Sequence, residues 1–190
     1  MSVIGRELIK KRLELPPDDV RALVITPLVR DSKGEISGLD YDSIDLRLGS
    51  RFLLPRAYDP KTKSDVRANR DAHELVQPIH VAAGQELLVP SHGTVLGVTL
   101  EFIKLPFDMS GQVLTRSSLA RDFITIETAP WIHPLYRGCL TLEIANASGI
   151  PFPIKPGKAI AQLILFRLLS GERPGQDHID RYMGPTFPEP

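Results

Sequence analysis

The densest group of polar side chains lies in the segment Thr115-Arg-Ser-Ser-Leu-Ala-Arg121, where two arginines flank two serines directly after an apolar stretch. Guanidinium groups match pairs of phosphate oxygens, and serine hydroxyls or backbone amides can complete an anion site. The segment therefore predicts a cradle for phosphate groups. It also fits an N-capped helical turn that carries two surface arginines, and the spacing alone leaves both interpretations open.

A candidate acid or base follows in the segment Leu140-Thr-Leu-Glu-Ile144. The alternation of this segment is that of a strand, and it places Glu143 on the face opposite the three apolar side chains. A carboxylate so placed can move protons if a substrate and a water molecule lie beside it. The alternative is an ordinary solvent-facing glutamate.

The elements that must hold these side chains are predicted to be mainly strands. The 17 prolines favour strands and turns over helices. Short apolar or alternating stretches, separated by turn-forming residues at 146–149 and 155–158, predict an antiparallel barrel or sandwich. The predicted strands are Ile44–Leu48, Val95–Leu100, Gln112–Leu114, Leu140–Ile144 and Ile160–Leu168.

One helix is predicted at the start of the chain, over about residues 2–15. Apolar residues recur there at helical spacing, Ser2 can cap the first turn, Glu7 and Lys11 stand four apart, and Pro16-Pro17 ends the pattern. The length of 190 residues fits a single domain over 1–190, with a tail from about residue 170 to residue 190.

Charge and cysteine content limit the possible partners. The 23 basic and 23 acidic residues cancel, so the chain has no overall field that would draw it to nucleic acid or an anionic membrane. A single cysteine, Cys139, cannot form an intramolecular disulfide, which favours the cytoplasm. No apolar stretch approaches the roughly 20 residues of a membrane helix, so we expect a soluble protein.

Taken in order, Arg116–Arg121, Trp131–Gly138 and Leu140–Ile144 resemble the deoxycytidine triphosphate (dCTP) deaminases of the dCTP deaminase/dUTPase superfamily. Pro156-Gly157 and Gln162-Leu163 extend the resemblance, and Asp45–Gly49 and Arg181-Tyr182 are weaker traces of it. The resemblance implies a mainly β fold, a distorted antiparallel β-barrel or β-clip like that of the dUTPases. It also implies a homotrimer with each active site at a subunit boundary.

The reaction that this resemblance implies is hydrolytic deamination of dCTP to dUTP and ammonia, in a bifunctional variant continuing to dUMP, with dTTP as a candidate inhibitor. Glu143 matches the catalytic glutamate, and Ser117 and Arg121 would position water and carboxylate. Mg²⁺ would enter only on the triphosphate, while the cysteines of a zinc deaminase site are missing. The implied nucleotide-binding residues are Arg116, Ser117, Ser118, Leu119, Ala120, Arg121, His133, Thr141, Leu142, Glu143, Arg181 and Tyr182.

The sequence departs from the family pattern in three places. His133 replaces the aspartate that reads the deoxyribose hydroxyl, the loop between Arg121 and Trp131 is one residue shorter, and the glutamine that normally follows the tail tyrosine is missing. His133 can still bond a sugar hydroxyl, or it is only a surface side chain. Two alternatives therefore stay open: a dUTPase, and a nucleotide-binding or regulatory protein with impaired turnover.

Overall fold

The computed structural model describes residues 2–56, 76–127, 131–169, 184 and 186–188. These residues form a mainly β structure, which confirms the predicted fold class. The two helices are α1, Arg6–Leu13, and α2, Ser117–Arg121. The strands are β1 Ser2–Val3, β2 Val24–Thr26, β3 Ser43–Arg47, β4 Arg51–Pro55, β5 Val76–His80, β6 Leu87–Val89, β7 Thr94–Lys104, β8 Met109–Thr115, β9 Ile124–Glu127, β10 Arg137–Asn146, β11 Phe152–Ile154 and β12 Ala159–Arg167.

The strands form three antiparallel sheets. In the first, β12 pairs with β8 along one edge and with β3 and β1 along the other. The second has the order β5-β4-β7-β10-β9, with β2 also paired to β7, and the third is the pair β6-β11. Among the described strands no sheet closes on itself. The fold is therefore an open β-clip, one of the two expected forms, and not a closed barrel.

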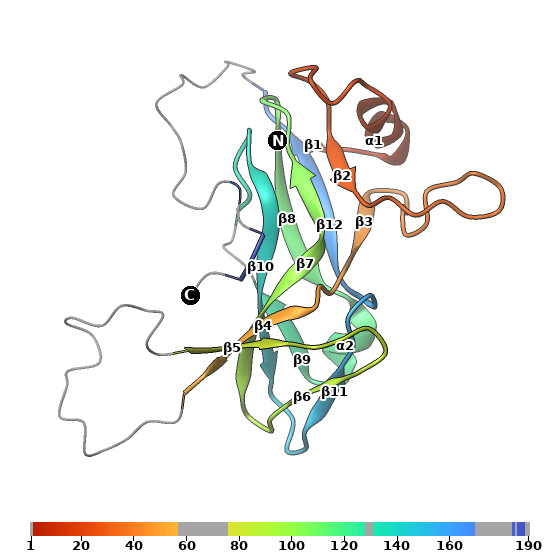
Figure 1. Cartoon of the computed structure of the whole chain (residues 1–190). Helices are drawn as coiled ribbons and strands as arrows, with labels where there is room; N and C mark the ends of the chain where they lie inside the picture. The colour runs from red at the N-terminus through yellow and green to blue at the C-terminus, as the bar shows by residue number, and fades with distance from the viewer. Residues whose placement is uncertain (1, 57–75, 128–130, 170–183, 185, 189–190) are drawn as a thin grey trace, which may run out of the picture.

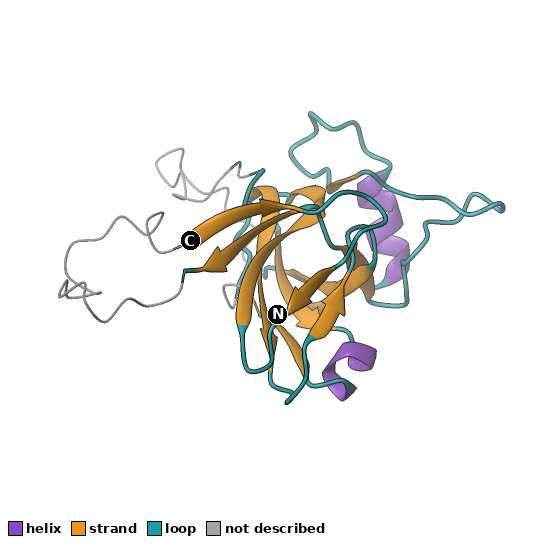
Figure 2. Cartoon of the chain, turned by 60° about the horizontal axis from the view of Figure 1, so that its bottom comes forward, coloured by secondary structure: helices purple, strands orange, loops and turns teal. Residues whose placement is uncertain are grey.

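The arrangement separates the two helices. Figure 1 shows α1 beside β2, while α2 lies at the opposite end of the long strands, next to β9 and β11. Figure 2 also shows the two helices as separate elements after the molecule is turned. Neither described helix is long and apolar enough to cross a membrane.

Alternating burial explains why the long strands form. In β10 the side chains of Leu140, Leu142 and Ile144 are buried, whereas Glu143 is exposed. In β12, Leu163 and Leu165 are fully buried in the same way. Each strand therefore turns one face to the core and leaves the other for polar side chains. The predicted strands at 95–100, 112–114, 140–144 and 160–168 are confirmed as parts of β7, β8, β10 and β12.

The N-terminal helix is shorter than predicted. Ser2 is not its cap, because Ser2 and Val3 form β1 and pair with Arg167 and Phe166 of β12. Gly5, with φ −81° and ψ 164°, is the N-cap residue. Glu35, in a distant loop, forms ion pairs with Arg6 at 2.8 Å and with Lys10 at 2.7 Å. The expected Glu7–Lys11 pair is not among the described ion pairs.

Several strands gave no clear pattern in the sequence. β5 and β11 each contain a proline, and β2, β6 and β11 have only three residues. Proline is confined to edges or ends of sheets, where it interrupts the alternation of apolar and polar side chains. β2 pairs with the long strand β7, β5 pairs with β4, and β6 and β11 pair with each other. Pairing within the fold therefore forms these strands, and not a pattern of their own.

A buried ion pair joins β3 to β7. Glu101 is only 3% exposed. Its carboxylate accepts hydrogen bonds from Arg47 Nε at 2.6 Å and from the Arg47 backbone N–H at 2.8 Å. The pair lies where the register between β7 and β10 shifts, between Cys139 and Thr141. It therefore fixes the irregular part of the second sheet to the strand that carries Asp45.

We predict that Arg47→Met destabilises the protein by about 3–5 kcal/mol, because it leaves the Glu101 carboxylate buried without its cation. Urea denaturation at neutral pH measures the loss. Arg21→Met is the matched control, since Arg21 pairs with Asp19 on the surface, with its side chain 59% exposed, and should cost at most about 1 kcal/mol. Equal losses in the two variants would contradict a structural role of the buried pair.

Candidate functional site

The cradle segment is positioned by its attachment to two sheets. Strand β8 ends at Thr115, whose side-chain oxygen accepts the Ile126 backbone N–H at 2.8 Å and donates to the Ile126 carbonyl at 3.0 Å. Ile126 belongs to β9, which pairs with β10. The residue directly before Arg116 is therefore fixed to the sheet that carries Glu143.

Arg116 is held by an acidic partner from another strand. Its Nη1 donates to Asp45 Oδ2 in β3, and Gln162 Nε2 donates to Asp45 Oδ1 at 3.4 Å. Gln162 is the register partner of Asp45 on one side and of Leu114 on the other. These side chains share one face of the sheet, and Arg116 continues that face two residues beyond Leu114.

The helical-turn interpretation of the cradle segment holds in part, and the phosphate-binding interpretation stays a prediction. Ser117 opens α2, and Leu119 packs against the core while Ser118 and Arg121 are exposed. A helical turn is thus present, although its N-cap residue is Arg116 and no side chain caps it. Ser117 and Ser118 are both exposed, whereas the Ala120 N–H donates to the Arg116 carbonyl at 3.0 Å.

Glu143 lies on the outer face of β10, as predicted. It is exposed, its neighbour Thr141 is half-buried, and Leu142 is buried on the opposite face. Its register partner in β9 is Glu127, also exposed. Helix α2 packs on β9, so the cradle and Glu143 lie at the same end of the molecule. Among the described residues, no hydrogen bond or ion pair joins Glu143 to Ser117 or Arg121.

The structure does not bring His133 to this group within one chain. His133 is exposed, and its carbonyl accepts the Tyr136 backbone N–H at 3.2 Å in the turn that leads into β10. From Arg137 at the start of β10 to Glu143, six residues of strand extend about 20 Å. Ile132 exchanges backbone hydrogen bonds with Gly111, near the beginning of β8, whereas Arg116 follows its end. Arg181 and Tyr182 lie outside the described residues.

A family model described as dCTP deaminase-like matches residues 9–168. The chain belongs to the dCTP deaminase-like family. The match spans every described residue of the candidate site, from Asp45 through Glu143 to Gln162.

Curated relatives cover between 77% and 100% of the chain. A protein of Parafrankia sp. (strain EAN1pec) named "dCTP deaminase, dUMP-forming" is 35% identical over 90% of this chain and 86% of its own length. A protein of the same name from Methanosphaera stadtmanae is 31% identical over 100% of this chain and 92% of its own. A protein of Natronomonas pharaonis named "dCTP deaminase" is 36% identical over 77% of this chain and 76% of its own.

A solved structure confirms the fold of this family member. The 2'-deoxycytidine 5'-triphosphate deaminase of Agrobacterium tumefaciens aligns with a TM-score of 0.61 and 20% sequence identity. The alignment covers 86% of this chain and 47% of that chain, so this chain spans about half the length of that protein.

Sequence reasoning did not assign two side chains that the structure places at the cradle, Asp45 and Gln162. Both stood in segments that resemble the dCTP deaminases, so the signal was present. Their meeting depends on β12 lying between β3 and β8, a pairing of strands far apart in the chain.

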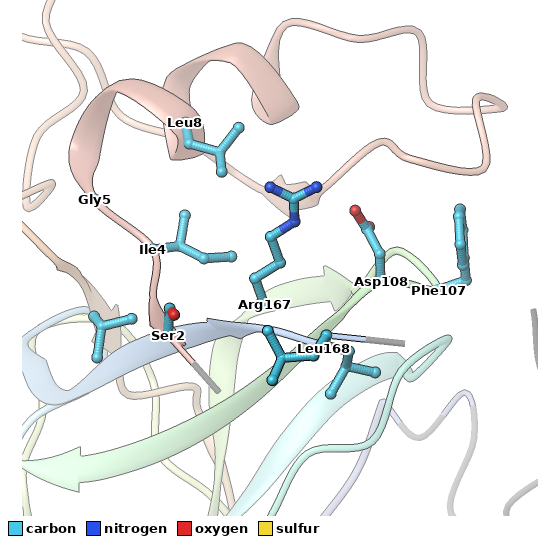
Figure 3. A pocket seen from close by; sticks show the side chains of 10 residues that line it. Ser2, Ile4, Gly5, Leu8, Phe107, Asp108, Arg167 and Leu168 are labelled. Carbon is cyan, nitrogen blue, oxygen red and sulfur yellow. The ribbon is translucent and has the colours of Figure 1, made fainter. Parts of the chain in front are cut away.

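Two cavities lie beside strands of the first sheet, at its two ends. One of about 320 Å³ is lined by Asp45, Arg47, Glu101, Gly38 and Lys158 among others, next to the cradle. Another of about 550 Å³ lies at the other end of the molecule, between the start of the chain, Asp108 and Arg167 (Figure 3). Among the described residues, no group of three or more His, Cys, Asp or Glu side chains gathers as it would around a metal ion.

The environment of Cys139 is unfavourable for a thiolate. Cys139 is half-buried in β10, and burial raises the pKa of its thiol, with a smaller contribution from the negative charge of Glu101. Because the thiolate is the reactive form, a raised pKa keeps the thiol protonated at pH values at which an exposed cysteine ionises.

We therefore predict that native protein reacts with iodoacetamide at pH 8.5 more slowly than urea-unfolded protein. The chain has one cysteine, so the alkylated mass reports Cys139 alone. The difference should shrink as the pH rises through the raised pKa. Equal rates for native and unfolded protein would show that the thiol is freely ionised.

Proposed function

We propose that this chain deaminates dCTP and then releases pyrophosphate, so that dCTP and two water molecules yield dUMP, ammonia and pyrophosphate. The observation that carries the proposal is the arginine–serine cradle beside a strand that presents Glu143, in a member of the dCTP deaminase-like family. The relatives from Parafrankia and Methanosphaera are both named dUMP-forming, which favours dUMP over dUTP as the final product.

In the deamination step, Glu143 takes a proton from a water molecule as the water oxygen bonds to C4 of cytosine. Glu143 passes this proton to N3 of the ring. It then takes the second proton from the new C4 hydroxyl and delivers it to the amino group, and the C4–N bond breaks as ammonia leaves. Ser117 and Arg121 hold the water and the carboxylate. This step uses no resident metal ion or zinc.

The triphosphate is held by Arg116, Ser117, Ser118 and the backbone N–H of Leu119, with the exposed Ala120 beside them. Arg116 still has guanidinium N–H groups beyond the one that bonds Asp45, and these can bind phosphate oxygens. Mg²⁺ would enter with the substrate and neutralise part of the charge of its phosphates. A second water then attacks the α-phosphorus, and pyrophosphate leaves with the electron pair of the broken P–O bond.

We propose that the active unit is a homotrimer. Glu143 makes no described contact with Arg121, and His133 lies at the far end of β10, so one chain does not gather all these side chains. A second copy placed across a subunit boundary can bring its hairpin to the cradle of the first. His133 would then reach the deoxyribose hydroxyl, and Thr141 and the backbone of Leu142 the base, since the Leu142 side chain is buried in the core. Arg181 and Tyr182 of the tail complete the proposed site.

The neutral charge balance and the single cysteine support a cytoplasmic enzyme that acts on free nucleotides. A dUTPase without deaminase activity is less favoured, because the relatives from Parafrankia and Methanosphaera are named dCTP deaminases. A binding protein without turnover has no evident use for an exposed Glu143 beside a phosphate cradle. Whether dTTP inhibits the enzyme is tested with the same assay.

We predict that Glu143→Gln abolishes ammonia release from dCTP while the fold is retained, because the amide cannot accept the proton of the attacking water. The loss should be at least about 100-fold, as expected for removal of a general base. Purified protein is incubated with dCTP and Mg²⁺, and dUTP, dUMP and ammonia are resolved over time. Glu127→Gln is the matched control, since Glu127 faces Glu143 from β9, and it should keep turnover within a few-fold.

Each outcome has a distinct meaning. Formation of dUMP and ammonia by wild type alone supports the proposal, and dUTP as the final product would limit it to deamination. Cleavage of added dUTP without ammonia release from dCTP would identify a dUTPase. Binding of dCTP without any reaction would identify a nucleotide-binding protein.

We further predict that Glu143→Gln and Arg121→Met, each inactive alone, recover activity when the two chains are unfolded and refolded together. Random mixing pairs an intact cradle with an intact Glu143 at about one boundary in four, so about a quarter of wild-type activity should return. Native mass spectrometry verifies that mixed trimers form. Mixed trimers without activity would place both side chains of each site in one chain.

A further inference from the structure

Asp45 forms contacts that the proposed reaction does not yet explain. It lies in β3, its side chain is 23% exposed, and it pairs with the Arg116 guanidinium, which is 32% exposed. Its second carboxylate oxygen accepts Gln162 Nε2 at 3.4 Å. Asp45 therefore contacts the first arginine of the cradle from an element outside the cradle.

The backbone holds Asp45 in place. The Asp45 N–H donates to the Gly38 carbonyl at 2.8 Å. Gly38 has φ +80°, and a Cβ built on it would lie 2.8 Å from Asp45 Cβ. A glycine at position 38 thus leaves room for Asp45, while the pairing of Asp45 with Gln162 fixes it from the other side.

Arg116 depends on this fixed partner for its orientation. Among the described residues, the hydrogen-bonding partner of the Arg116 guanidinium is Asp45. An arginine side chain has many rotamers, and a phosphate can bind its planar fork in two-point fashion only when the fork faces it. A carboxylate that binds one Nη atom leaves the other N–H groups to face a ligand.

We propose that Asp45 is the positioning residue for Arg116, orienting the guanidinium for the triphosphate before the substrate binds. The inference rests on the proposed function of the cradle. Asp45 also acts against binding, because its negative charge lies near that of the phosphates. The orienting effect outweighs this repulsion, since Arg116 and Gln162 already neutralise and bond the carboxylate.

The test is a comparison of KM with kcat. Asp45→Asn should raise KM for dCTP about tenfold, which is the effect of losing one hydrogen bond to a charged group, and leave kcat within about twofold. Asp42→Asn, three residues earlier in an exposed position, removes the same charge and should change neither constant. An unchanged or lowered KM for Asp45→Asn would show that repulsion dominates and would overturn the proposal.

A double-mutant cycle separates this role from a merely structural one. If Asp45 acts through Arg116, adding Asp45→Asn to Arg116→Ala should raise KM no further. Independent, multiplying effects would contradict the proposal. Should Asp45→Asn not fold, as judged by circular dichroism, Asp45→Glu keeps the charge but moves the guanidinium by one methylene. It should also raise KM at constant kcat, and an unchanged KM would count against the proposal.

Titration with inorganic tripolyphosphate distinguishes failure of this inference from failure of the proposed function. Wild type that binds tripolyphosphate more tightly than Asp45→Asn supports the positioning role even if no ammonia is released from dCTP. Wild type that deaminates dCTP but binds tripolyphosphate no better than the variant retains the function and loses the inference.

Discussion

The register of β12 between β3 and β8 is the constraint on which the cradle depends. Gln162 of β12 stands opposite Asp45 on one edge and opposite Leu114 on the other. All three therefore point to one face, and Arg116, two residues beyond Leu114, meets Asp45 there. A slip of one residue in either pairing would turn one partner into the core and leave the other without its counter-charge.

The second sheet positions Glu143, the proposed acid–base group, in a similar way. Pairing of β10 with β9 and β7 buries Leu142 and Ile144, and this burial turns Glu143 outward. Thr115 then fixes the end of β8 to β9, which brings the cradle to the same end of the molecule as Glu143. The hydrophobic effect acts on the apolar residues, and the position of the carboxylate is its consequence.

Charged side chains close to the proposed site, and not the net charge of the chain, can attract an anionic nucleotide. The chain is neutral overall, so an anionic nucleotide is not drawn to it by a long-range field. Arg116 and Arg121 can provide a local positive region. Asp45 reduces its positive charge and, as proposed above, fixes the orientation of the Arg116 guanidinium. Arg47 lies two residues beyond Asp45 on β3, and its buried pair with Glu101 holds β3 against β7. Structural and proposed binding charges thus share one strand.

The sequence by itself determined the mainly β class, the long alternating strands, the outward face of Glu143 and the family, because each depends on local period or on short ordered motifs. It did not reveal the short or proline-containing strands, or the start of α1, where pairing of Ser2 and Val3 with β12 overrides helical spacing. Only the tertiary structure decided that Asp45 meets Arg116 and that His133 lies apart from Glu143, since both depend on pairings between distant strands that no local pattern records.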